Sequence, residues 1–154
     1  MSTVGDYAEL AERYCSLIEE ADRADPLRFL ERIEELLSKL YASASKLPDV
    51  EATSDDPQVP KRVMSTAEWT TAFERLNRLL GSDDRYQTEG LERSLADDLL
   101  DIYRELRDGL GAMRSGAAPE DVLWEWRFGF EAHWAAHAEG ALFAIRNVLG
   151  RASS

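Results

Sequence analysis

The sequence predicts an all-α protein: a single-domain bundle of four to five helices, up-and-down in topology, with a long C-terminal helix. Apolar residues recur with the helical period of about 3.6 residues, and no segment shows the alternation of a strand. Proline and capping residues stand where helices would begin. The length of 154 residues suits one domain. We therefore expect residues 1–154 to form one helical domain, with a long proline-containing loop at 47–64 and a tail at 151–154.

The first helix is expected from about Asp6 to Ala21, where tyrosine, leucine and isoleucine fall on one side. The second helix begins after Asp25, an N-cap residue, because Pro26 follows it at a position where a missing N–H costs nothing. Its apolar stripe continues to Ala44, and Pro48 ends it.

The third helix opens with Ser65 and Glu68, which form a capping box, and ends at Gly81. The fourth begins near Ser94. The fifth begins at Pro119 and continues to about Leu149. Two glycines inside it, Gly129 and Gly140, lower its helix propensity, and such residues permit a close helix crossing.

A helical wheel of the last helix, drawn at 100° per residue, predicts two apolar faces. One face holds Trp124, Phe128, Ala135, Ala138, Leu142, Ile145 and Leu149. The opposite side holds Trp126, Phe130, His133, His137, Ala141, Ala144 and Val148. A helix that is apolar almost all round is central in its bundle or shared with a second chain.

The polar residues of this helix form the candidate site. His133 and His137 are four residues apart, so both rings leave the helix on one side and could share a metal ion. The fourth helix carries an acidic stripe, and Asp98 or Asp101 would meet these histidines if the stripe faced them. The stripe consists of Asp98, Asp101, Glu105 and Asp108.

A structural interpretation explains the same residues without a binding site. The two histidines would be hydrogen-bonded and partly buried, and the acidic stripe would be a solvated face. Arg127 and Glu131, also four residues apart, would form an intrahelical ion pair at the edge of the core.

Catalytic motifs are missing from the sequence. The segment from His133 to His137 lacks the glutamate of a zinc-protease helix, and Glu131 and His133 are not spaced as in di-iron bundles. We therefore expect no cofactor. The alternative is a divalent metal ion at His133 and His137.

Composition limits the classes of partner. A net charge of −12 argues against nucleic acid and against anionic membrane surfaces. The N-terminal segment has no signal-peptide pattern, which predicts a cytoplasmic protein. Cys15 stands alone among apolar neighbours and is expected to be an inert buried thiol.

Three stretches carry a resemblance to a known family. They are Ala8–Cys15, Ser94–Leu106 and Val122–Trp134, the last of which reads VLWEWRFGFEAHW. In these stretches the chain resembles a bacterial family known only as domain of unknown function 5063. The resemblance implies a small helical bacterial protein and transfers no catalytic residue.

The function expected from the sequence is non-catalytic: a helical module that binds a protein partner or a second copy of itself. One alternative is the metal or acid–base site of His133 and His137 with fourth-helix carboxylates. Another is a pocket for a small, cationic ligand lined by Trp124, Trp126 and Trp134. The sequence identifies no substrate, partner or pathway.

Overall fold

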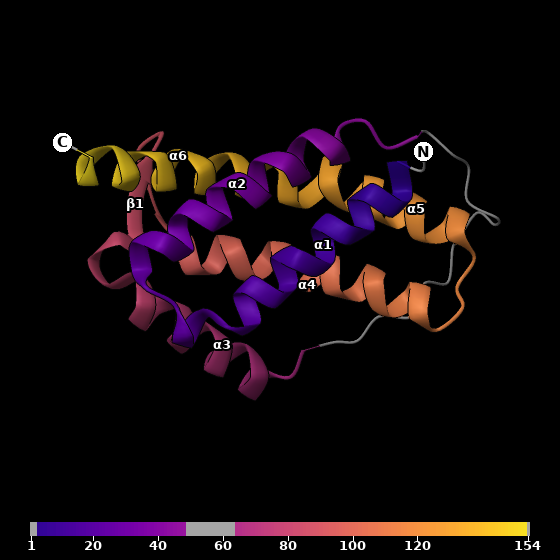
Figure 1. The fold of residues 1–154 in the computed structure, drawn as a ribbon, viewed down its shortest axis with the longest axis horizontal. Coiled ribbons are helices and arrows are strands. Elements are labelled where there is room, and N and C mark those ends of the chain that lie inside the picture. Colours follow the sequence, from indigo (N-terminus) through magenta and orange to yellow (C-terminus); the bar gives the residue numbers. More distant parts are fainter. Residues whose placement is uncertain (1–2, 49–63, 154) are drawn as a thin grey trace.

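The fold is a bundle in which neighbouring helices run antiparallel (Figure 1). The computed structural model describes residues 3–48 and 64–153. Its elements in chain order are α1 (Thr3–Glu19), η1 (Ala21–Arg23), α2 (Pro26–Ala44), α3 (Thr66–Leu80), η2 (Gly81–Asp83), β1 (Arg85–Thr88), β2 (Leu91–Ser94), α4 (Leu95–Arg114), α5 (Pro119–Gly129), η3 (Phe130–Trp134) and α6 (Ala135–Ala152). Most of the predicted 47–64 loop lies outside the described residues.

The core lies between α1, α2, α4 and the long C-terminal helix formed by α5, η3 and α6. Helix α1 contacts α2 and α4, and α6 contacts the same two helices from the other side. Helix α3 packs on the outside of this ring, against α4 and η1. The predicted all-α bundle with a long C-terminal helix is therefore confirmed. Among the described residues, no helix is long and apolar enough to cross a membrane.

Local sequence signals begin the helices as expected. The side chains of Asp25, Ser65 and Ser94 each accept a hydrogen bond from the backbone N–H three residues further on. The side chain of Glu68 accepts a hydrogen bond from the backbone N–H of Ser65 and completes the capping box. These bonds satisfy N–H groups that have no partner within the helix.

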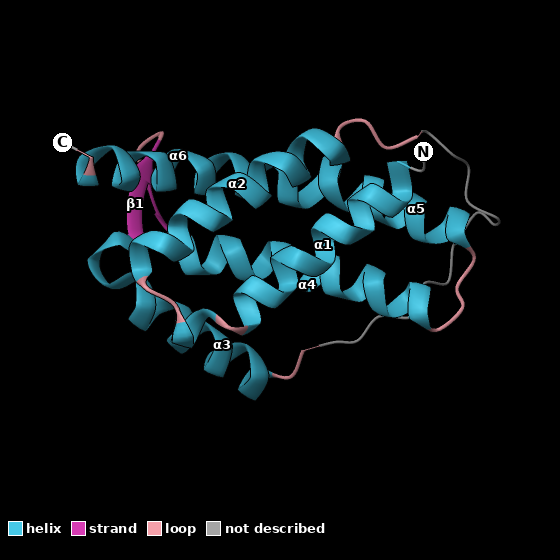
Figure 2. Cartoon of the chain, viewed as in Figure 1, coloured by secondary structure: helices cyan, strands magenta, loops and turns pink. Residues whose placement is uncertain are grey.

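A short hairpin between α3 and α4 corrects the expectation that the chain has no strand. Strands β1 and β2 pair antiparallel, with Tyr86 opposite Arg93 (magenta in Figure 2). The turn places Glu89 at φ 53° and Gly90 at φ 79°. Two successive positive φ values are typical of the tight hairpin turns that match strand twist. Each strand has four residues, too few for its alternation to stand out in the sequence.

The C-terminal helix is interrupted by a π-helical turn at Phe130–Trp134, which corrects the wheel. A π turn closes hydrogen bonds five residues apart, so the following residues are shifted by about one position relative to a continuous α-helix. Trp126 and Phe130 therefore share the buried side with Trp134, Ala138 and Ile145. Phe128, predicted on an apolar core face, is 49% exposed.

The glycines of the C-terminal helix make room for side chains and not for a helix crossing. A Cβ atom at Gly140 would lie 2.5 Å from the hydroxyl of Tyr86. A Cβ atom at Gly129 would lie 2.9 Å from Oε2 of Glu105. Gly140 thus lets the hairpin lie directly against α6.

Cys15 is buried, as expected, and is a free thiol. Burial raises its pKa to about 12, with Glu19 adding to the effect. At neutral pH the sulfur is therefore protonated and a poor nucleophile.

Candidate functional site

A buried carboxylate, Asp98, lies at the centre of a polar cluster between the hairpin, α4 and α6. Its Oδ2 accepts a hydrogen bond from the hydroxyl of Tyr86. Its Oδ1 accepts a bond of 3.0 Å from Arg93 and lies 2.7 Å from Nδ1 of His137. The side chain is almost fully buried, so these three groups replace the water that an exposed carboxylate would bind. We call Tyr86, Arg93, Asp98, Asp101 and His137 the Asp98 cluster.

Hairpin register brings two members of the cluster together. Tyr86 and Arg93 are directly opposite each other across the strands, so their side chains lie on the same face. Asp84 holds the base of the hairpin to α4. Its carboxylate accepts bonds from the hydroxyl of Ser94 and, at 2.7 Å, from the backbone N–H of Ala96. The cluster is therefore positioned by a rigid connection.

His137 contacts two of the acidic residues of α4, Asp98 and Asp101. Its Nδ1 faces Asp98, and its Nε2 lies 3.3 Å from Oδ2 of Asp101. The hydrogen bond to Asp98 raises the pKa of His137 above its usual value near 6.5, against the opposing effects of burial and Arg93. An imidazolium donates from both nitrogens, which is the form that two carboxylates favour.

The pKa values of Tyr86 and Asp101 are also shifted by their surroundings in the cluster. Burial, and then the bond to Asp98, raises the pKa of Tyr86 well above its ordinary value, so the phenol remains a donor. Burial also raises the pKa of Asp101, with Asp97 as a second cause, whereas His137 opposes that rise. His137 in this cluster is therefore more readily protonated than a free histidine. The hydrogen-bond donors of the cluster face its acceptors.

His133 lies apart from this cluster. Its Nδ1 is 3.1 Å from Oε1 of Glu105, and its side chain is 60% exposed. The ring also meets Phe128 edge-on, at 6.1 Å between centroids. Both histidines therefore face α4, as expected if its acidic stripe pointed this way, but they contact different carboxylates. Within the described residues, no group of three or more His, Cys, Asp or Glu side chains is placed to hold a metal ion.

Two of the proposed site residues point elsewhere. Arg127 lies 3.1 Å from Glu131 and donates a bond of 2.6 Å to the carbonyl of Leu47, beyond the end of α2. Arg127 and Glu131 thus form the intrahelical ion pair that their spacing of four residues allowed. The structure thus joins Asp98, Asp101 and His137 and leaves Arg127 and Glu131 outside.

The three tryptophans differ in burial and in the rings that they contact. Trp126 and Trp134 are buried in the core, the first against Tyr7 at 4.8 Å between ring centroids. Trp124 instead stacks on the exposed ring of Phe128, at 5.2 Å and an interplanar angle of 3°.

Tyr86 and Arg93 were missed by the sequence analysis because the hairpin was missed. The available signal was Glu89-Gly90, a turn dipeptide with glycine in its second position, flanked by strand-forming Tyr86 and Thr88. Nothing in the sequence indicates that this hairpin packs on α6.

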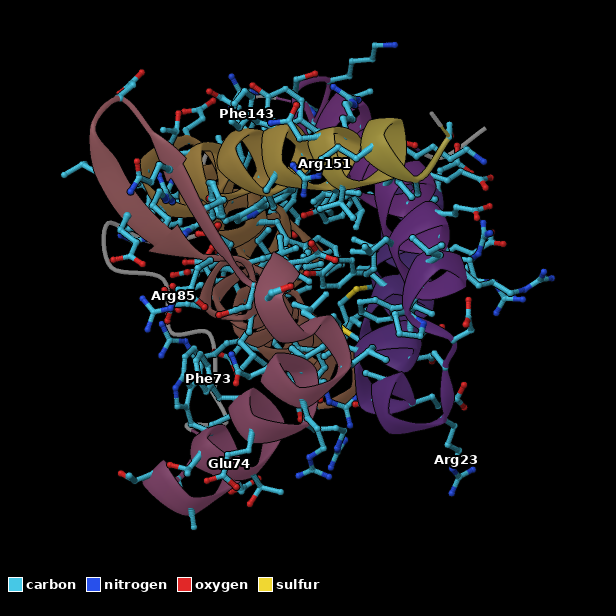
Figure 3. All side chains as sticks on the ribbon, turned by 90° about the vertical axis from the view of Figure 1, so that its left-hand side faces the viewer. Arg23, Phe73, Glu74, Arg85, Phe143 and Arg151 are labelled. Atoms are coloured by element: carbon cyan, nitrogen blue, oxygen red, sulfur yellow. The ribbon has the colours of Figure 1, made fainter. Side chains whose placement is uncertain are left out.

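The outer side of the C-terminal helix forms a second candidate site. Phe128 and Phe143 are 49% and 48% exposed, and the exposed Ala132 and Ala136 lie between them. Phe128 precedes the π turn, Ala132 lies within it, Ala136 and Phe143 follow it, and all four are exposed on the outer side of the helix. Figure 3 shows Phe143 projecting from α6 away from the core. We call Trp124, Phe128, Ala132, Ala136 and Phe143 the outer strip.

Comparisons with known proteins agree with this fold. The family model described as "Domain of unknown function (DUF5063)" matches residues 2–150. The chain is similar in structure to protein BF1032 from Bacteroides fragilis, a structural-genomics target known from a crystal structure. The TM-score is 0.85 at 22% sequence identity, and the match covers 96% of this chain and 92% of that one. No curated protein matches the sequence.

Proposed function

The chain belongs to the family of domain of unknown function 5063, and we propose that it is a non-catalytic helical module that binds another protein through its outer strip. The observation that carries this proposal is the exposure of two phenylalanine rings on one side of the C-terminal helix. Aromatic side chains are enriched at protein interfaces because they bury much apolar area at a small cost in conformational entropy.

The rigidity of the helix supports the proposal. The opposite side of the same helix is buried in the core, where Trp134 is 1% exposed. The Asp98 cluster fastens α6 to α4 and to the hairpin. A rigid helix face loses little entropy when a partner binds it.

Cross-linking tests the proposal directly. A photoreactive phenylalanine analogue is placed at Phe128, at Phe143 or, as a control, at Leu91 on the hairpin turn, which is 64% exposed. After irradiation in the cells that produce the protein, we expect adducts with another protein from the two strip positions and none from Leu91. Equal adducts from all three positions, or none from the strip, would contradict the proposal.

An acid–base site at His137 is the second candidate. The 2.7 Å contact between Asp98 and Nδ1 resembles the pairing that orients a catalytic imidazole. Against it, Nε2 is already engaged by Asp101. A reaction that requires this site would be abolished in His137→Gln, whereas the cross-linking pattern of the outer strip would remain.

A further inference from the structure

We propose that the partner of the outer strip is a basic amphipathic helix, with apolar residues on the face that meets the strip and arginines at its edges. This inference rests on the proposed function and adds the chemistry of the partner. It follows from the shape of the strip, the charge of its rim and the aromatic pair at one end.

The apolar part of the strip matches one face of a helix. Two large rings, Phe128 and Phe143, lie at its ends, and the methyl groups of Ala132 and Ala136 lie between them. Small residues allow a second helix backbone to approach closely, and the rings at either end would flank it. Recognition of this kind uses partner side chains spaced three and four residues apart.

Two carboxylates, those of Glu131 and Glu139, lie at the rim of the strip. Glu139 is exposed, and its carboxylate accepts a 2.7 Å hydrogen bond from Tyr41, a neutral group that leaves the negative charge in place. The side chain of Glu131 is 59% exposed, and its carboxylate is paired with Arg127 at 3.1 Å. The second arginine beside the strip is also engaged within the protein, because Arg146 lies 3.2 Å from both Glu34 and Ser38.

Charge therefore favours a basic partner over a second copy of this chain. The protein has a net charge of −12. A two-fold contact through the strip would bring the same rim against itself, so Glu139 of each copy would add to the repulsion between two chains of the same net charge. Arginine or lysine side chains at the edges of a partner helix would instead meet carboxylates.

The aromatic pair favours arginine over lysine. Trp124 and Phe128 are stacked in parallel, and the ring of Phe128 remains half exposed. A guanidinium group is planar and stacks on such rings. The protein already contains one example, since Arg104 lies over the ring of Trp69 at 5.6 Å.

Two synthetic helical peptides test the inference. They share one leucine face and differ only in the polar face, which carries arginine in one peptide and glutamate in the other. Fluorescence anisotropy measures their affinity for the full chain at low and at moderate salt. We expect binding of the arginine peptide that weakens with salt, and no binding of the glutamate peptide. Binding of both peptides alike, or of neither, would overturn the inference.

Surface variants establish where the peptide binds. Phe128→Ser and Phe143→Ser should each weaken binding about tenfold, which corresponds to about 1.4 kcal/mol. Leu91→Ser makes the same kind of change at an exposed apolar residue of the hairpin, outside the strip, and should leave the affinity unchanged. Glu131→Gln combined with Glu139→Gln should weaken the arginine peptide and reduce its salt dependence. If the phenylalanine variants bind the arginine peptide as tightly as the unmodified protein does, the attraction is non-specific and the proposed site is wrong.

The two proposals can fail separately. If cross-linking from the strip captures a protein but the arginine peptide does not bind, the interaction surface stands and its basic specificity is wrong. If the captured protein is a second copy of this chain, the inference is also wrong. If the strip yields no adduct, the proposed function itself fails.

Discussion

Replacing Asp98 with asparagine should destabilise the protein by about 3 kcal/mol near pH 6. The carboxylate receives hydrogen bonds at Oδ1 from Arg93 and from the charged form of His137. A hydrogen bond to a charged group contributes about 1.5–3 kcal/mol, against about 1 kcal/mol for a neutral one. The amide weakens both bonds, removes the carboxylate that Arg93 contacts and leaves His137 with Asp101 as its remaining acidic partner. For a chain of this size the loss lowers Tm by about 8 °C.

The pH dependence of that loss tests the role of His137. The folded-state pKa of His137 is raised, so the stability it contributes is complete below its unfolded pKa near 6.5 and disappears as pH rises through the folded value. Asp98→Asn removes that contribution. The difference in stability between the two proteins should therefore be largest at pH 6 and fall by about half at pH 9, where only the bond from Arg93 remains charged.

Urea unfolding of both proteins at pH 6 and pH 9 measures the effect. Asp97→Asn is a matched control, because it removes the same charge one residue earlier from a side chain that does not contact His137. We expect it to change stability by less than about 0.5 kcal/mol at either pH. An Asp98→Asn effect that is the same at both pH values would refute the conclusion that His137 is held charged by Asp98.

Three further changes test other parts of the fold. Gly140→Ala should destabilise by about 1–3 kcal/mol, because its Cβ would lie 2.5 Å from the Tyr86 hydroxyl, whereas Gly150→Ala in open space should stabilise by up to about 1 kcal/mol in thermal unfolding. Ser65→Ala removes an N-cap and should cost about 1 kcal/mol in urea unfolding, and no loss would contradict the capping box. Cys15 should react with a thiol reagent only after denaturation, since its pKa is about 12 and it is buried, and rapid reaction of the native protein would refute this.

Much of the helical architecture could be predicted because helix signals are local. A capping residue such as Ser94 acts on a backbone N–H three residues away, and an apolar stripe needs only neighbouring turns. The possible meeting of Asp98 with His137 was also predictable as an alternative, since both lie beside apolar faces that must pack somewhere. The sequence could not show that this contact forms in preference to the alternatives, because no local signal indicates which helix faces pack together.

The π turn and the hairpin could not be predicted from the sequence, for physical reasons. The π turn at Phe130–Trp134 changes the phase of the helix by about one residue, and a wheel drawn with constant rotation cannot contain that shift. Phe128, before this turn, is 49% exposed, and Trp134, at its end, is 1% exposed. The hairpin depends on its contacts with α4 and α6, since an isolated two-stranded hairpin is only marginally stable in water.

The sequence by itself determined that the chain is helical, where most helices begin, that the protein is strongly acidic and that Cys15 lies in an apolar stretch. These properties depend on composition and on interactions within a few residues. Tertiary structure alone decided that Tyr86 and Arg93 complete the Asp98 cluster, that His133 and His137 have separate partners, and that the outer strip is exposed. Each of these depends on the packing of segments far apart in the chain, where a shift of one residue turns the face of a helix by about 100°.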